Sequence, residues 1–204
     1  MNASARTSPE ILPEVYFDPY FEQDAVKVLP GGYYVTARDM ILVTVLGSSV
    51  CACLRDAQSG VGGVCHFMLP ERQPNQEWLD ISMRYGRHAM TTLLEQLRKS
   101  GARPERVQAK VFGACNALES PGGQKMGLYN SRFVVQYLQQ QGIPVLATDL
   151  MDVYPRKVYF FPRSGRVLVK KLKKLNNTTL LDREADYYRR LSDLELSDEM
   201  EMYP

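Results

Sequence analysis

The stretch MILVTVLGSSVCACLRDAQSGVGGVCHFM, residues 40–68, determines the fold class of this chain. It contains three runs rich in β-branched and other apolar residues, at 40–46, 50–54 and 61–68. Short runs of this composition, separated by glycine, serine and aspartate, are typical of β-strands. Because the breaks between them are only a few residues long, the sequence predicts that these strands are antiparallel neighbours.

Two helices and five further strands are predicted outside this stretch. Residues 80–100 form the first helix, because Met83, Met90, Leu94 and Leu97 recur at helical spacing before a C-terminal glycine, Gly101. Residues 130–141 form the second, with Phe133, Val134, Tyr137 and Leu138 facing inward. The further strands are predicted at 33–36, 107–112, 145–150, 158–161 and 167–172. Many strands with two interposed helices predict a single α+β layered domain.

Length and composition exclude several classes of protein. The 204 residues are 45% hydrophobic and 24% charged, which is typical of a globular domain rather than a disordered or fibrous chain. The longest uncharged run, 40–54, is shorter than the roughly 20 residues of a membrane-spanning helix. The N-terminus lacks the pattern of a secretory signal, so we expect a cytoplasmic protein without membrane insertion. The four cysteines are then expected to be thiols.

Charge is distributed unevenly along the chain. Residues 156–174 carry eight Lys or Arg and no acid, whereas 182–204 carry eight Asp or Glu. We expect an N-terminal extension at 1–27, the domain at 28–175 and an acidic tail at 176–204. The basic stretch is interpreted as the solvated edge of a hairpin, and a docking role for it stays open. Nucleic acid is not an expected partner, because the net charge is only +2 and no nucleic-acid motif is present.

The two histidines differ in their surroundings. His88 falls off the apolar stripe of the first predicted helix, so we expect it at the surface. His66 lies late in a strand among apolar residues. A neutral imidazole buried there needs hydrogen-bond partners, and it is either a structural residue bonded to the backbone or a functional base.

The turn Gly47-Ser48-Ser49 interrupts the apolar run and also allows two interpretations. It is an ordinary hairpin turn, or it presents a nucleophile beside backbone N–H groups that hold an oxyanion. The second interpretation requires a base, and a strand pair joined through 55–60 would return His66 to a place beside Ser49.

The cysteines offer a metal site as a rival. Cys51, Cys53, Cys115 and His66 carry suitable donor atoms. However, two alternate cysteines on one strand do not have the paired spacing of a structural zinc site, and buried thiols are common. We therefore predict no metal.

From residue 28 to residue 172 the chain resembles the CheD chemoreceptor glutamine deamidases of bacterial chemotaxis. The motifs that carry the resemblance, in order, are LGSSV at 46–50, GGVCHFMLP at 62–70, KVFGACN at 110–116, GLYN at 127–130, DVYPRK at 152–157 and RSGRV at 163–167. The resemblance implies a mixed, largely antiparallel β-sandwich-like core with flanking helices, similar to cysteine-dependent deamidase toxins. It also implies a hydrolase that converts receptor glutamine to glutamate, a protein-glutamine glutaminase that needs no cofactor.

Residue roles follow from the resemblance by position. In this family a cysteine after Leu-Gly-Ser attacks the glutamine amide, a histidine is its base, and a threonine on the preceding strand completes the triad. Here these positions are held by Ser49, His66 and Thr44, with Val43 as the alternative register for the threonine. Backbone N–H groups of Gly47 and Ser48 would stabilise the oxyanion.

Ser49 is the departure from the family pattern. A hydroxyl is much harder to activate than a thiol, so this chain is expected to be inactive or weakly active. The alternative function is a non-catalytic module that binds chemoreceptor cytoplasmic domains or a CheC-type phosphatase. A nucleic-acid binder using the basic stretch is a third, less favoured hypothesis.

Overall fold

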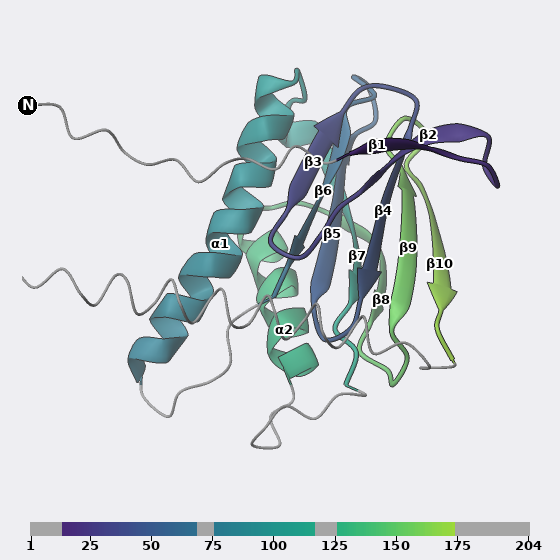
Figure 1. Cartoon of the computed structure of the whole chain (residues 1–204). Coiled ribbons are helices and arrows are strands. Elements are labelled where there is room, and N and C mark those ends of the chain that lie inside the picture. The colour runs from purple at the N-terminus through teal and green to yellow at the C-terminus, as the bar shows by residue number, and fades with distance from the viewer. Residues whose placement is uncertain (1–13, 69–75, 117–125, 174–204) are drawn as a thin grey trace, which may run out of the picture.

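The computed structural model describes residues 14–68, 76–116 and 126–173. In this part of the chain, ten strands form two five-stranded sheets, and two α-helices lie against one of them (Figure 1). The expected acidic tail and residues 1–13 of the expected N-terminal extension lie outside the described residues.

The two sheets are mixed but largely antiparallel, as the predicted fold class requires. The outer sheet has the order β1-β2-β4-β9-β10, with β1 Val15–Asp18, β2 Gln23–Lys27, β4 Ile41–Leu46, β9 Arg156–Phe161 and β10 Arg166–Lys171. The central sheet has the order β3-β6-β5-β7-β8, with β3 Tyr33–Thr36, β6 Gly62–Phe67, β5 Val50–Asp56, β7 Val107–Gly113 and β8 Val145–Leu150. Only the pairs β2–β4 and β7–β8 are parallel.

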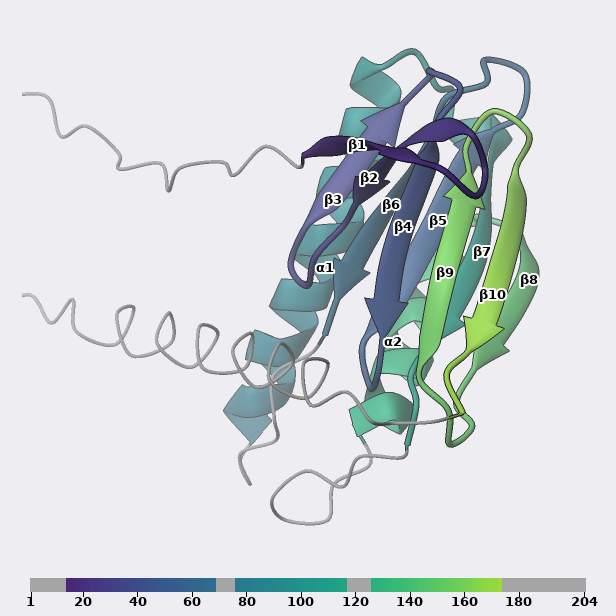
Figure 2. The same cartoon turned by 45° about the vertical axis from the view of Figure 1, so that its right-hand side comes forward.

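The sheets stack face to face, with the helices on the far side of the central sheet (Figures 1 and 2). Leu42 and Leu46 of β4, Cys51 and Cys53 of β5, and Phe160 of β9 fill the space between the sheets. A second core lies between the central sheet and the helices and includes Val50, Ala52 and Leu54. The alternation along β5 therefore reflects its position between two apolar layers.

One pairing predicted from sequence is wrong. β4 and β5, expected to be antiparallel neighbours, belong to different sheets: β4 pairs with β2 and β9, and β5 pairs with β6 and β7. Gly47, Ser48 and Ser49 carry the chain from one sheet to the other instead of closing a hairpin. The predicted antiparallel pair of β5 and β6 is confirmed.

Both predicted helices are present with shifted starts. α1 spans Gln76–Lys99 and α2 spans Met126–Gln140, each beginning four residues before its predicted start. Gly101 has a φ of 99° and ends α1 as predicted, with hydrogen bonds from its own N–H to Arg98 and from Ala102 to Leu97. A short 3₁₀ helix, Pro104–Arg106, leads into β7. Within the described residues, neither helix combines the length and the apolar character needed to cross a membrane.

Residues 15–27, part of the expected N-terminal extension, contribute β1 and β2 to the outer sheet. Ala25 and Val26 of β2 are fully buried, and their strand pairs with Ile41, Leu42 and Val43 of β4. The β9–β10 hairpin around Gly165 was predicted, and it makes β10 the edge strand that carries much of the basic stretch.

Candidate active site

Thr44, His66 and Ser49 form one hydrogen-bonded chain of buried side chains. Oγ1 of Thr44 lies 2.8 Å from Nδ1 of His66, and Nε2 of His66 lies 2.8 Å from Oγ of Ser49. The Thr44 hydroxyl also donates to the carbonyl oxygen of Val28, at 2.8 Å. Val43, the alternative register, belongs to an apolar cluster on the other face of β4. The structure thus brings together the three side chains named from sequence.

These contacts identify the tautomer of His66. A threonine hydroxyl has one proton, and Thr44 uses it on the Val28 carbonyl, which can only accept. The proton between Thr44 and His66 is therefore carried by Nδ1. A neutral imidazole has a single N–H, so Nε2 presents its lone pair to Ser49, and the Ser49 hydroxyl donates to it.

Burial keeps His66 neutral. Its side chain is only 1% exposed, and this desolvation lowers its pKa to about 4, opposed by the nearby Val28 carbonyl, which favours the protonated ring. At neutral pH the ring is therefore uncharged, and its Nε2 accepts a hydrogen bond from Ser49. The ring contacts the side chains of Thr44 and Ser49, so His66 is not the purely backbone-bonded histidine considered from sequence.

The site is assembled where the chain crosses between the sheets. Thr44 comes from β4 of the outer sheet, and His66 comes from β6 of the central sheet. In the β5–β6 pair, Cys51 is opposite His66 and Val50 is opposite Phe67. Ser49, directly before β5, therefore meets the end of β6, as the predicted strand pair requires. A hairpin within one sheet would not have brought Thr44 to the opposite side of the imidazole.

The crossing turn is held by hydrogen bonds to all three of its carbonyl groups. The backbone N–H of Cys115 donates to Gly47, and that of Ala114 donates to Ser49, both at 2.7 Å. Nδ2 of the buried Asn130, on α2, donates to the carbonyl of Ser48 at 2.8 Å. Three donors, two from the residues directly after β7 and one from α2, therefore fix the backbone that carries Ser49.

The turn also packs closely on the end of β7. Gly113 has a φ of 113°, and a Cβ atom at this position would overlap the carbonyl oxygen of Ser49. Only glycine meets both conditions without strain. The Ser48 hydroxyl is buried and donates to Sδ of Met68 at 3.3 Å. The hydroxyl is therefore engaged elsewhere, and of Ser48 only the backbone N–H was named from sequence as an oxyanion donor.

The described cysteines are not arranged as a metal site. Sγ of Cys51 and Sγ of Cys53 are 3.7 Å apart, whereas Cys65 contacts Met90 on the helix side of the sheet. Burial raises the pKa of Cys65, and the hydrogen bond with Cys53 followed by burial raises that of Cys51. Across residues 14–68, 76–116 and 126–173, no three His, Cys, Asp or Glu side chains are grouped to hold a metal ion. His88 is exposed on α1, as expected.

Sequence reasoning missed two supporting residues. The sequence predicts Asn130 only as the first residue of a helix, but it shares the buried stripe with Phe133, Val134 and Tyr137, a position where a polar residue signals a specific hydrogen bond. Arg156 was counted in the solvated basic stretch, yet it is fully buried.

Arg156 supports the end of β7 next to the crossing turn. Its Nη2 pairs with Oδ1 of Asp149 at 2.7 Å, and its Nη1 donates to the carbonyls of Tyr154 and Gly113 at 3.0 and 3.4 Å. The hydrogen bond from Arg156 lowers the pKa of Asp149. Strand alternation places Arg156 on the same face of β9 as Val158 and Phe160, and that signal was available in the sequence.

Comparison with known proteins gives a weak likeness to a solved structure and much closer relatives by sequence. The crystal structure of the Bacillus licheniformis hypothetical protein YfiH aligns with a TM-score of 0.38 and 14% identity, over 59% of this chain and 49% of that one. Proteins named probable chemoreceptor glutamine deamidase CheD are far more similar. The one from Janthinobacterium sp. (strain Marseille) is 48% identical over 98% of this chain and 99% of its own length. The one from Thiobacillus denitrificans is 50% identical over 95% and 96%.

A family match agrees with these relatives. The family described as CheD chemotactic sensory transduction matches residues 68–171, which begin just after His66. The alignments to the relatives extend over nearly the whole chain and so include the turn and both strands of the site. The chain belongs to the CheD family of chemotaxis proteins.

Proposed function

We propose that this protein has the active site of a chemoreceptor glutamine deamidase, in which Ser49 holds the nucleophile position. The observation that carries the proposal is the buried relay from Thr44 through His66 to Ser49, with both contacts at 2.8 Å. The relatives bear the name of this activity, and their similarity spans nearly the full length of the chain. The substrate is a glutamine side chain in a receptor's cytoplasmic domain, which places the protein in the cytoplasm.

The reaction follows from the tautomer. Nε2 of His66 accepts the Ser49 proton as Oγ attacks the carboxamide carbon, and the protonated ring then gives this proton to the departing nitrogen, which leaves as ammonia. Water, deprotonated by the same Nε2, hydrolyses the resulting ester to glutamate and restores the Ser49 hydroxyl. Thr44 holds Nδ1–H throughout, which orients the ring and stabilises its protonated form.

The backbone N–H groups of Gly47 and Ser48 are the proposed oxyanion donors. Support comes from the rigidity of the turn, because the carbonyls of Gly47, Ser48 and Ser49 are all held by other elements. Fixed donors stabilise a developing oxyanion by about 3 kcal/mol each, since they need no reorganisation during the reaction. No cofactor takes part in this scheme.

With serine at position 49 the reaction is slow or absent. A thiol has a pKa near 8.5 and gives up its proton far more readily than a hydroxyl. His66, whose pKa is lowered to about 4, is a weak base for an alcohol. The Ser49→Cys variant is therefore expected to deamidate much faster than the unaltered chain.

The test compares four proteins on one substrate. The unaltered chain, Ser49→Cys, Ser49→Ala and Ser49→Cys with His66→Gln are each incubated with a purified chemoreceptor cytoplasmic fragment. Ammonia release is measured, and mass spectrometry locates glutamines that have become glutamate. We expect clear activity only in Ser49→Cys. Activity of Ser49→Cys no higher than that of Ser49→Ala would refute the assignment of the triad.

A non-catalytic binding module is the second candidate, and the complete burial of Ser49 favours it. In this function the protein docks on chemoreceptors or on a CheC-type phosphatase without turnover. The measurement is binding of the unaltered chain and of His66→Gln to each partner by calorimetry. Equal affinities, together with an inactive Ser49→Cys, would support the binding module and exclude the deamidase.

A further inference from the structure

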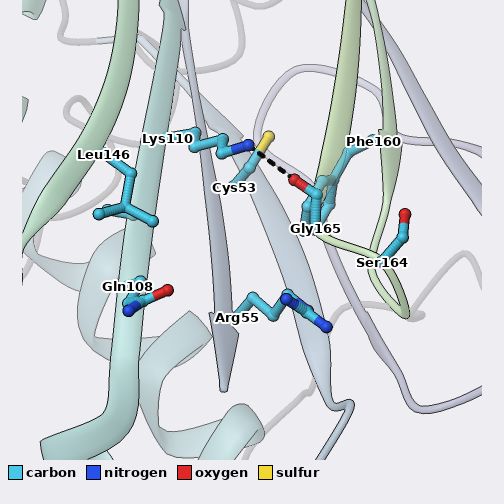
Figure 3. Close-up of a pocket in the computed structure, with 9 residues that line it drawn as sticks. Cys53, Arg55, Gln108, Lys110, Leu146, Phe160, Ser164 and Gly165 are labelled. Atoms are coloured by element: carbon cyan, nitrogen blue, oxygen red, sulfur yellow. Dashed lines mark hydrogen bonds between the residues drawn. The ribbon is translucent and has the colours of Figure 1, made fainter. Parts of the chain in front are cut away.

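A second site of interest lies in a pocket of about 220 Å³ between the two sheets (Figure 3). Arg55 and Lys110 line it from the central sheet, and Phe160, Ser164 and Gly165 line it from the β9–β10 hairpin. Leu146, which is 56% exposed on the edge strand β8, lies at the mouth. The pocket shares no residue with the relay of Thr44, His66 and Ser49.

The pocket occupies the opposite end of β5 from the candidate active site. Arg55 follows Ser49 by six residues, which is about 20 Å of extended chain. In the pairing of β5 with β7, Cys53 is opposite Lys110 and Arg55 is opposite Gln108. This face of the central sheet is apolar further along, so two cations at its end call for an explanation.

Among the described residues, no acid neutralises either cation. Lys110 donates from Nζ to the carbonyl of Gly165 at 2.8 Å, and Arg55 donates from Nη2 to the carbonyl of Arg163. Within the described residues, neither side chain forms an ion pair, and the pocket lining contains no Asp or Glu. The Nε atom of Arg55 is buried, and it has no hydrogen-bond partner in the part of the chain that the structure describes.

The guanidinium of Arg55 is held in place by its neighbours. A Cβ atom on Gly165 would lie 2.9 Å from Nη1 of Arg55, so the glycine lets the hairpin backbone pack against the planar group. The hydrogen bond from Nη2 to the carbonyl of Arg163 fixes the other side of the guanidinium. An arginine whose guanidinium is positioned this firmly is suited to bind an anion through its planar fork.

We propose that this pocket binds a phosphate group. Two positive charges without an acidic partner among the described residues match a phosphate monoester, which carries about −1.5 to −2 at neutral pH, whereas one carboxylate would leave one cation uncompensated. Arg55 supplies the fork, and Lys110 supplies a compact charge. The volume is below the roughly 300 Å³ at which pockets for drug-sized ligands begin, so the bound group is small.

In the experiment the full chain is titrated with inorganic phosphate, and the heat of binding is measured by calorimetry at constant ionic strength. Lys110→Gln and Arg55→Lys are the test variants, and Lys170→Gln on the exposed face of β10 is the matched control. Each lost charged hydrogen bond is expected to weaken phosphate binding about tenfold or more, whereas the control changes it less than about twofold. Arg55→Lys keeps the charge and loses only the fork, so it tests the geometry separately.

Further arms identify the source of the phosphate and check the folding of the variants. Acetate at the same ionic strength is expected to bind at least about tenfold more weakly than phosphate. Tighter binding of a short phosphoserine peptide would assign the site to a phosphorylated partner, and equal binding would assign it to a small phosphate compound. Thermal unfolding measured without phosphate verifies that each variant is folded.

Three outcomes would overturn the proposal: no saturable phosphate binding by the unaltered chain, affinities in Lys110→Gln and Arg55→Lys equal to that of the control, or equal binding of acetate. The two cations would then serve only to fasten the β9–β10 hairpin to the central sheet. Because the pocket is separate from Ser49, the result does not depend on deamidase activity.

Discussion

Replacing Thr44 with valine tests the link between stability and the proposed relay. Thr44 is buried between two polar groups, the Val28 carbonyl and Nδ1–H of His66, each 2.8 Å from its hydroxyl oxygen. Valine has nearly the same shape but neither donates nor accepts a hydrogen bond. The substitution therefore leaves the fold's packing intact and removes one acceptor and one donor together.

The magnitude follows from the two groups that lose their partner. A buried polar group without its hydrogen bond costs about 1–3 kcal/mol, so we expect Thr44→Val to lower the free energy of unfolding by roughly 2–5 kcal/mol. Thr44→Ser is the matched control, because it keeps the hydroxyl and loses one methyl group, at a cost of about 1 kcal/mol. In the Ser49→Cys background, Thr44→Val is also expected to lose most activity, while Thr44→Ser keeps it.

Two measurements decide the matter. Urea unfolding gives the free energies of the three proteins, and nitrogen-15 NMR of the histidine rings gives the tautomer directly. The chain has only two histidines, so His88→Gln assigns the signals of His66. The reasoning fails if Thr44→Val is no less stable than Thr44→Ser, or if the His66 ring in the unaltered chain carries its proton on Nε2.

Three further predictions concern pH and the supports of the turn. Burial lowers the pKa of His66 to about 4, whereas the same side chain in an unfolded chain has a pKa of about 6.5, so the unfolded state takes up a proton first as the pH falls. The contribution of His66 to stability is therefore full above pH 6.5 and falls by about 3 kcal/mol towards pH 4. In urea unfolding, His66→Gln should flatten the loss of stability between pH 6.5 and 5. Gly113→Ala should destabilise the protein by roughly 2 kcal/mol or more and reduce the activity of Ser49→Cys, because the new Cβ overlaps the Ser49 carbonyl; an unchanged thermal midpoint would contradict this contact. Arg156→Met should cost roughly 2–4 kcal/mol, since Asp149 and two carbonyls lose a donor, and Lys157→Met on the same strand is the control; equal unfolding free energies of the two variants would remove the assigned role.

The parts of the site that are local in sequence could be predicted, and the parts that depend on sheet partners could not. The return of His66 to Ser49 depends only on one hairpin, and the spacing of strands around 55–60 was enough to predict it. Whether Gly47-Ser48-Ser49 closes a hairpin or crosses between sheets depends on what covers β4. Both faces of β4 are apolar, with Ile41 and Val43 on one side and Leu42 and Leu46 on the other. This pattern indicates that both faces of β4 are covered. It does not identify the two strands that pair with β4 at its edges, β2 and β9, because these lie far from each other in the chain.

The supports of the turn were missed for a related reason. Asn130 and Arg156 are polar residues on buried faces, and a residue's chemistry alone predicts that such side chains are at the surface. Their roles depend on carbonyl groups of Ser48 and Gly113, which only the tertiary structure brings to them. In both cases the helical or strand period placed the residue on the buried face, so the period was a better guide than the side chain's polarity.

The same burial that organises the relay makes the identity of residue 49 decisive. A neutral His66 with its proton on Nδ1 is correctly oriented to receive a proton, but a pKa of about 4 makes it a poor acceptor. Moving a proton to His66 from a thiol of pKa about 8.5 costs about 6 kcal/mol when the attraction between the two resulting charges is left out. From a hydroxyl the cost is considerably larger. Because the site is buried, the attraction between a thiolate at position 49 and the imidazolium would offset part of the smaller cost. We therefore expect the relay geometry to support catalysis only with a nucleophile that is already acidic, and we expect Ser49 to leave a folded, hydrogen-bonded site that turns over slowly.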